Sequence, residues 1–152
     1  MYRNKFMQLA LEEAKIALSQ DEVPVGAVIV KNDEIISTAH NTREASKNAL
    51  HHAEILAIDS ACKALGGWRL WQCEMYITME PCPMCAGAIV NARIPNIYFG
   101  AFDSKYGACG SAVDLMNMRE NFNVKCEGGF MQEESLELFK EFFEKLRKKR
   151  KS

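Results

Sequence analysis

The sequence predicts a single α/β domain: a three-layer α/β/α sandwich whose mixed sheet has about five strands. Three observations lead to this fold class. Apolar residues recur at helical spacing in several segments, short β-branched segments lie between them, and no repeat or long linker divides the 152 residues. Hydrophobic residues form 48% of the chain, which is ordinary for a globular protein, and a chain of 152 residues can bury a core that needs no disulfide or metal support. We therefore expect one domain over residues 1–152.

The first half of the chain predicts a helix, a β-hairpin and a second helix. Apolar side chains recur every three or four positions over residues 2–19, which is typical of an amphipathic helix. Residues 25–31 and 34–39 are short strand-like segments, and the Asn-Asp turn signal between them indicates a hairpin. Apolar residues again follow one side of a helix over 52–65, and two glycines directly after it end that helix.

The middle of the chain predicts strands that alternate with helices. Residues 74–79 alternate like a strand, and the prolines that follow open a helix extending to about residue 92. Residues 96–101 form another strand. Strands separated by helices indicate a mixed or parallel sheet that is covered on both faces.

The last third predicts a loop region and a closing helix. A glycine-rich loop at 107–110 precedes a short helical segment near 111–118, and residues 124–127 form a last strand. A long amphipathic helix then extends over 132–150.

The charge of the chain is unevenly distributed. The net charge is −1, but residues 145–152 form a basic tail that holds six of the 19 basic residues and no acidic one. Such a tail can bind a polyanion, or it can be the solvated end of a helix whose cations face the negative end of the dipole. Charge alone leaves both interpretations open.

The sequence contains no candidate for a membrane-spanning helix. No segment contains the roughly 18 consecutive apolar residues that a membrane span requires. The first residues lead into a charged amphipathic segment, not into the apolar segment of a signal peptide. We therefore expect a cytoplasmic protein with reduced cysteines and no membrane contact.

Two short motifs carry the chemistry. His52-Ala-Glu54 starts one predicted helix, and Pro-Cys82-Pro-Met-Cys85 starts another. Zinc binds imidazole nitrogen and thiolate sulfur in a tetrahedron, and two cysteines three positions apart at a helix start can face one point. His52, Cys82 and Cys85 are therefore predicted to hold one zinc ion. The fourth position stays open to water, as in catalytic zinc sites.

Glu54 is the predicted catalytic residue. It lies two positions after His52, within reach of a water on the zinc. Zinc lowers the pKa of such a water to about 7, and a carboxylate beside the resulting hydroxide can pass protons to a substrate. A second interpretation stays open, in which Glu54 is a fourth ligand that closes the site.

Each motif is weak by itself, because a lone CxxC also occurs in redox pairs and in structural zinc sites. The joint pattern HxE…PCxxC is the known signature of zinc-dependent nucleobase deaminases. Its spacing selects His52 as the ligand. The neighbouring His51 would point about 100° away on a helix.

Beyond these motifs, the sequence resembles the bacterial tRNA-specific adenosine deaminases of the TadA type, within the cytidine deaminase superfamily. The resemblance extends over roughly residues 5–147. Its landmarks besides the metal motifs are residues 22–27, 40–41, 68–70, 100–105, 107–111 and 142–143. The zinc motif marks the superfamily, whereas the segment 100–111 and the closing Phe-Phe helix resemble the TadA branch.

The resemblance implies a cytidine deaminase-like fold and a homodimer that converts the wobble adenosine of an arginine tRNA anticodon to inosine. Asn41 would hydrogen-bond the flipped base. Further contacts to the anticodon stem-loop would come from Asp103, Ser104, Lys105, Phe142, Phe143 and Arg147. Such a loop is single-stranded, so its bases can be splayed out and read on their edges.

The chain departs from the family pattern at a few positions. Residues 49–51 read Ala-Leu-His where the family often has Pro-Thr-Ala, and Pro83 stands where Val is common. Phe102 and Tyr106 are bulky beside the implied anticodon contacts. None of these changes removes a catalytic group, and they bear on the pocket wall and the substrate.

Three other functions share part of this evidence. A zinc deaminase of free bases or nucleosides, such as guanine or cytosine, would have the same metal site. A non-enzymatic RNA-binding module with structural zinc would need a fourth protein ligand. A CxxC thiol oxidoreductase would oxidise the Cys82–Cys85 pair and would be indifferent to zinc chelators.

Overall fold

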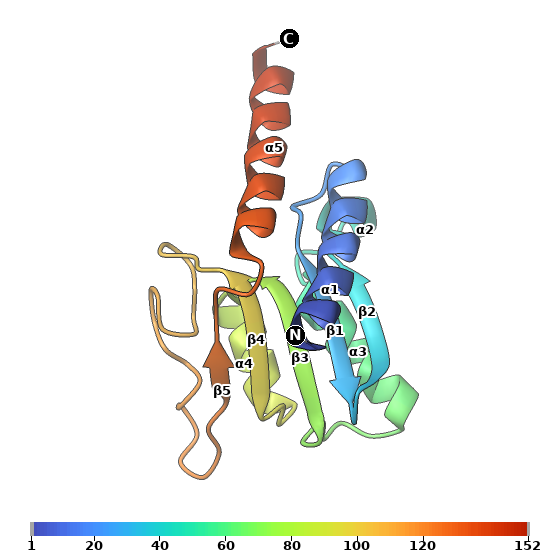
Figure 1. The fold of residues 1–152 in the computed structure, drawn as a ribbon, viewed down its shortest axis with the longest axis vertical. Helices are drawn as coiled ribbons and strands as arrows, with labels where there is room; N and C mark the ends of the chain where they lie inside the picture. The colour runs from blue at the N-terminus through green and yellow to red at the C-terminus, as the bar shows by residue number, and fades with distance from the viewer. Residues whose placement is uncertain (1, 152) are drawn as a thin grey trace.

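The computed structural model describes residues 2–151, and Figure 1 shows their arrangement. The helices and strands are, in chain order, α1 (Tyr2–Ser19), β1 (Gly26–Lys31), β2 (Glu34–His40), α2 (Arg43–Ser46), α3 (Ala53–Leu65), β3 (Cys73–Met79), α4 (Pro83–Asn91), β4 (Asn96–Ala101), β5 (Lys125–Glu127) and α5 (Gln132–Lys151).

The strands form one mixed sheet in the order β2-β1-β3-β4-β5. The hairpin strand β1 pairs antiparallel with both β2 and β3, while β3, β4 and β5 are parallel to one another. The helix α4 connects β3 to β4, because parallel neighbours need a crossover. The predicted hairpin and the five-stranded mixed sheet are thus confirmed.

Helices cover both faces of the sheet. Alternate residues of β1 face opposite sides, as the period of a strand requires. Ala27 and Ile29 pack into a core cluster with α3 and α4, whereas Val28 and Val30 pack against α1. α5 lies on the same side as α1, so the domain has the predicted three layers.

α5 is held at its start and projects at its end. The Ser135 hydroxyl donates to the Thr78 carbonyl of β3 at 2.6 Å, and Leu138 packs on α1. Beyond these contacts the helix extends away from the sheet (Figure 1), and its exposed end carries the basic tail, which is helical as far as Lys151. None of the described helices combines the length and apolar character that crossing a bilayer requires.

The predicted helix near 111–118 is wrong. That segment consists of turns and one bridge, in which Cys109 pairs with Asp114. The backbone N–H groups of Cys109 and Ser111 donate to the buried carboxylate of Glu80, and Gly110 has a φ of 125°. The N–H groups of Ala112, Val113 and Leu115 donate to the carbonyls of Gly107 and Ala108, five to seven residues earlier, so the bonds over four residues that define an α-helix do not form.

The short helix α2 is the other difference, because no helix was predicted between β2 and α3. It is a single turn that ends at Lys47 in the left-handed conformation, with a φ of 52°. A single turn buries no apolar stripe, and therefore leaves no periodic signal in the sequence.

Candidate active site

One edge of the sheet collects the ends of several elements. β3 and β4 are parallel, so both end at this edge, where Met79 pairs with Ala101. β1 is antiparallel to β3 and therefore starts there, and β2 ends beside it, with Gly26 opposite His40. Side chains that directly precede or follow these strands meet at this edge, where α/β sheets commonly bind ligands.

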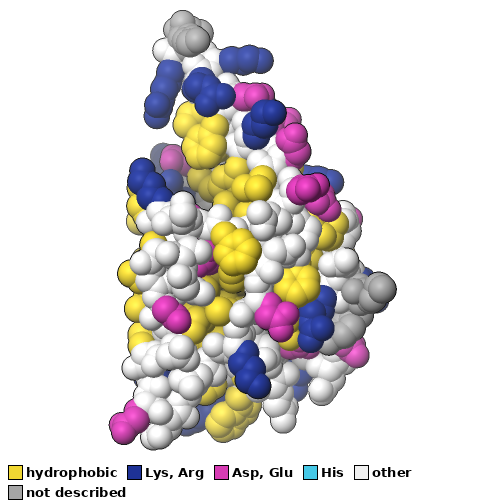
Figure 2. Space-filling view, turned by 60° about the vertical axis from the view of Figure 1, so that its left-hand side comes forward, with side chains coloured by type: hydrophobic (Ala, Val, Ile, Leu, Met, Phe, Trp, Pro, Cys, Tyr) yellow, Lys and Arg dark blue, Asp and Glu magenta, His cyan; other side chains and the backbone are white. Residues whose placement is uncertain are grey.

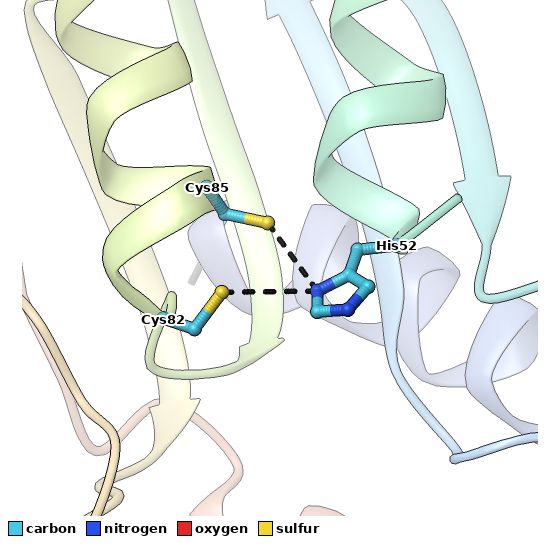
Figure 3. A group of neighbouring side chains, drawn as sticks. All are labelled: His52, Cys82 and Cys85. Carbon is cyan, nitrogen blue, oxygen red and sulfur yellow. Dashed lines mark hydrogen bonds between the residues drawn. The ribbon is translucent and has the colours of Figure 1, made fainter. Parts of the chain in front are cut away.

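The predicted metal ligands lie at the N-termini of two helices that start at this edge. His52 is the N-cap residue of α3, and Cys82 is the N-cap residue of α4, whose first turn contains Cys85. Figure 3 shows the three side chains pointing toward one another from the two helices. Both cysteines lie at the positive end of α4, which favours a thiolate at Cys82.

The distances between these atoms fit a tetrahedral metal site. The Nδ1 atom of His52 lies 3.8 Å from the Sγ atom of Cys82 and 3.6 Å from that of Cys85. Zinc–nitrogen and zinc–sulfur bonds of about 2.1 and 2.3 Å at a tetrahedral angle place such atoms about 3.6 Å apart. All three donor atoms lie within 4.8 Å of one another, so the group can hold a metal ion.

No fourth donor joins this group among the residues that the structure describes. Its members are His52, Cys82 and Cys85, and the Glu54 carboxylate is outside it. The arrangement agrees with three protein ligands and an open position, and disfavours Glu54 as a fourth ligand.

The three ligand side chains shift the pKa values of one another. The hydrogen bond that Cys85 donates lowers the pKa of Cys82 to about 4, while the same bond and burial raise the pKa of Cys85. Hydrogen bonding to Cys82 raises the pKa of His52. A metal ion bound here would take the place of these protons, because its ligands are the deprotonated groups.

Glu54 is buried beside the metal group. Only 4% of its surface is exposed, and burial raises the pKa of its carboxyl group to about 7. A carboxyl group with a pKa near neutrality can both accept and release protons at the pH of the cell. This position fits the predicted proton shuttle.

A pocket of about 370 Å³ opens above this group. His52, Glu54 and Cys82 line it together with Asn41, from the end of β2, and Asp103, which follows β4. Its other lining residues are Val23, Val25, Arg43, Ala53, Met79, Glu80, Tyr106, Phe139 and Phe143. Two of the predicted metal ligands, the predicted catalytic residue and the predicted base contact thus line one cavity.

Asn41 is held in place by a second buried carboxylate. Its Nδ2 atom donates to Oε1 of Glu22 at 3.3 Å, and its backbone N–H donates to the carbonyl of Val25 at 3.2 Å. Glu22 also accepts from the backbone N–H groups of Glu44 and Ala45, at 3.0 and 2.7 Å. The wall around Asn41 is therefore built on Glu22.

Glu80 also lines the pocket and holds the loop that follows β4. Its carboxylate accepts from the backbone N–H groups of Asp103, Cys109 and Ser111 and from the Ser111 hydroxyl. Gly107 packs so closely on this carboxylate that a Cβ atom would overlap it. The loop 103–111 is thus folded around one buried acceptor.

The remaining predicted RNA contacts lie at or outside the pocket rim. Asp103 lines the pocket and accepts from the backbone N–H groups of Lys105 and Tyr106, whereas Ser104 and Lys105 are exposed beyond it. Phe143 lines the rim and is 48% exposed.

Two predicted contacts on α5 do not line the pocket. Phe142 packs on the cluster between α1 and α5, and Arg147 is exposed further along the projecting helix. In Figure 2 the basic side chains gather at the projecting end of α5, above hydrophobic surface on the body of the domain.

Sequence reasoning assigned no role to Glu22, Glu80 or Phe139. Both glutamates precede a proline-containing turn at the start or end of a strand, a place where a carboxylate can accept free backbone N–H groups. Phe139 stands one helical turn before Phe143, and this spacing is the signal that places both side chains on the same face of α5.

Comparison with known sequences finds relatives over nearly the whole chain. A family model described as MafB19-like deaminase matches residues 1–147. The chain is 49% identical over 149 residues to the tRNA-specific adenosine deaminase of Bacillus subtilis (strain 168), an alignment that covers 97% of this chain and 92% of that protein.

Solved structures show the same fold. A structure from a study of A-to-I editing by tRNA:A34 deaminases at the wobble position matches with a TM-score of 0.82 and 39% identity, covering 88% of this chain and 98% of the other. A guanine deaminase from Bacillus subtilis matches with a TM-score of 0.63 and 39% identity, covering 64% of this chain and 63% of the other.

Proposed function

The chain belongs to the MafB19-like deaminase family, and its sequence aligns over nearly its whole length with tRNA-specific adenosine deaminases. We propose that it converts adenosine to inosine at the wobble position of a tRNA anticodon. The family resemblance and the cytidine deaminase-like fold expected from the sequence are thereby confirmed. One observation carries the proposal. Glu54 is buried at the pocket beside three side chains whose donor atoms can hold a metal ion, and its carboxylate is not one of those donors.

The metal is proposed to be a single zinc ion held by His52, Cys82 and Cys85. One imidazole and two thiolates are donors that zinc prefers, and the distances between them suit its tetrahedron. Bound zinc would lower the pKa of a water molecule to about 7 and so supply a nucleophile near neutral pH.

Glu54 is proposed to carry the protons of the reaction. Its carboxylate takes a proton from the attacking water and delivers it to N1 of adenine, while the water oxygen bonds to C6. Glu54 then takes the remaining proton from the hydroxyl group on C6 and passes it to the amine, which leaves as ammonia while the C6 carbonyl forms, so that adenosine and water give inosine and ammonia. Its raised pKa suits a group that must accept and release a proton in one turnover.

The residues around the pocket favour a nucleotide within an RNA loop as the substrate, in preference to a free base. Phe139 and Phe143 bring aromatic surface of α5 to the rim, where bases next to a flipped nucleotide can stack. Beyond this rim, α5 carries exposed basic side chains that can attract phosphates, including Arg147. Ser104 and Lys105 lie outside the cavity, on the side of the loop 103–111.

A deaminase of free guanine is the second candidate, because the guanine deaminase structure shares 39% identity over part of the chain. The two candidates predict different substrates. The purified zinc form should produce inosine in an anticodon stem-loop with adenosine at the wobble position, and should release little ammonia from free guanine, cytosine or adenosine. Rapid release of ammonia from a free base without inosine in the stem-loop would favour the second candidate.

The arginine tRNA and the cytoplasmic location remain parts of this proposal. The chain's own residues do not distinguish one isoacceptor from another. Inosine mapping of total tRNA incubated with the enzyme should yield a signal at the wobble position of an arginine tRNA, and a signal in a different isoacceptor would correct the assignment. A tRNA substrate supports a cytoplasmic location.

We further propose that the protein is a homodimer. A hollow of about 450 Å³ lies beside the metal-bearing helices and is lined by Leu50, Ile55, Met84, Gly87, Ala88, Asn91, Met118 and Arg119. Leu50 and Met118 are 56% and 52% exposed, so apolar surface is available for a second copy.

Gly87 offers a direct test of this interface. A Cβ atom at Gly87 would meet nothing within 4 Å, so Gly87→Arg should leave the fold of one chain intact but block the hollow. Sedimentation should show a dimer for the wild-type protein and a monomer for Gly87→Arg. Gly67→Arg is the control, because Gly67 has equally open surroundings and lies outside the hollow. A monomeric wild-type protein would contradict the proposal.

A further inference from the structure

We propose that Glu22 is a positioning residue that fixes the orientation of the Asn41 amide, so that the carbonyl oxygen of Asn41 faces the base in the pocket. This inference rests on the proposed function, since it assigns a task to Asn41 in holding the substrate. The inference depends on one contact: the buried carboxylate of Glu22 accepts a hydrogen bond from the side chain of Asn41, which lines the pocket.

Glu22 is a buried carboxylate that accepts three hydrogen bonds. It is 1% exposed, and its partners are the side chain of Asn41 and the backbone N–H groups of Glu44 and Ala45. No cation forms an ion pair with it among the residues that the structure describes. Three donors satisfy the charge in place of a cation, since a buried charge needs such compensation.

The orientation of the Asn41 amide follows from this arrangement. A carboxylate only accepts hydrogen bonds, so the NH₂ group of Asn41 must face it. The opposite orientation would place the Asn41 oxygen against the Glu22 oxygen, with a buried repulsion and a lost hydrogen bond. Because the backbone N–H of Asn41 is bound to the carbonyl of Val25, the residue itself has little freedom to adjust.

The other side of the amide faces the substrate space. Asn41 is only 5% exposed and lines the pocket, and its Oδ1 atom has no hydrogen-bond partner in the described part of the chain. This oxygen is also not fully enclosed by protein atoms, so a molecule in the pocket can reach it. It is therefore an acceptor presented to the cavity, held there before the substrate arrives, and such preorganisation saves the cost of ordering the group on binding.

Glu22 and Asn41 should therefore act as one unit. Glu22→Gln retains the shape but introduces an NH₂ group, which allows the Asn41 amide to turn over. With Asn41 intact, this change should lower kcat/KM on the anticodon stem-loop roughly tenfold, the scale of one misplaced hydrogen bond. In an Asn41→Ala background the same change should have less than about a twofold effect, because the group that Glu22 positions is gone.

The double-mutant cycle separates positioning from simple support. If Glu22 only held the turn α2, the loss from Glu22→Gln would be the same with and without Asn41, and equal losses would overturn the inference. Glu13→Gln is the matched control, because Glu13 bonds His40, the neighbour of Asn41, at 3.0 Å and lies outside the pocket. It should leave kcat/KM unchanged. Melting temperatures and zinc content of every variant verify that the comparison concerns folded holoenzyme.

A second measurement tests the orientation without using activity. In NMR spectra of the zinc form, the side-chain NH₂ signal of Asn41, identified by its loss in Asn41→Ala, should exchange slowly with solvent in the wild-type protein and faster in Glu22→Gln. Equal exchange in the two proteins would overturn the inference. A wild-type protein without activity on the stem-loop would instead contradict the proposed function, and the NMR result would still decide whether Glu22 fixes the amide.

Discussion

The Nδ1 atom of His52 lies 3.6 Å from the Sγ atom of Cys85, although 33 residues separate them in the chain. The contact exists because α3 and α4 both start at the edge where β3 ends and β1 begins. Neither helix can hold a metal without the other. Damage to one ligand should therefore abolish binding at the whole site.

Replacing a zinc ligand should empty the site. Cys85→Ala removes a fully buried donor and leaves two ligands, too few for stable zinc binding. We expect the zinc content, measured by atomic absorption, to fall from about one ion per chain to near zero. Cys62→Ala is the control, because Cys62 lies outside the metal group and should retain full zinc. A Cys85→Ala protein that keeps its zinc would show that the ligand set is different.

Replacing the proton carrier should separate binding from catalysis. Glu54→Gln keeps the shape of the buried side chain but cannot accept a proton. We expect kcat for inosine formation to fall by roughly 10²- to 10⁴-fold, the usual contribution of a general acid–base group, with zinc content unchanged. Ammonia release and zinc content measured on the same sample provide the check. Loss of zinc in Glu54→Gln would instead make Glu54 a ligand.

Removing the carboxylate of Glu80 should loosen the loop 103–111. Glu80→Ala leaves the N–H groups of Asp103, Cys109 and Ser111 without their acceptor. We expect the free energy of unfolding in urea to fall by roughly 2–4 kcal/mol, and by about 1 kcal/mol for Ser111→Ala, which removes one donor. Hydrogen exchange should increase within the loop first. Unchanged exchange there would contradict the role of Glu80.

The start of β1 should not tolerate a side chain at Gly26. A Cβ atom there would overlap the carbonyl oxygen of Ala10 and lie 2.7 Å from the backbone nitrogen of Ala14, both in α1. We expect Gly26→Ala to lower the free energy of unfolding by roughly 1–3 kcal/mol or more, since helix and strand must separate. Gly67→Ala, with nothing within 4 Å of its Cβ position, should change it by less than about 0.5 kcal/mol. Similar values for both would mean that α1 can shift freely.

The periodic features of the fold could be predicted from the sequence. Each long helix buries one face, and this repeats in the sequence every three to four residues, while the central strands β1, β3 and β4 are short apolar segments buried on both faces. The turn α2 and the region 111–118 have no such pattern. In the latter, Glu80, which lies 31 positions before Ser111, binds the first residue, and the next N–H groups bond to carbonyls outside a helical register.

The donor types of the proposed metal site were also determined by local sequence. His52 with Glu54, and Cys82 with Cys85, are close in the chain, so helix geometry alone makes each pair share one end of a helix. The types of donor then indicate zinc without any knowledge of the fold.

Only the tertiary structure decided how these pairs meet and what surrounds them. The order β2-β1-β3-β4-β5 brings Glu22 behind Asn41 and Glu80 under the loop 103–111, and it places Phe139 at the rim while Phe142 packs inside. These relationships join residues far apart in the chain. They depend on strand pairing and on the burial of charged groups, and neither can be predicted from the spacing of residues along the chain.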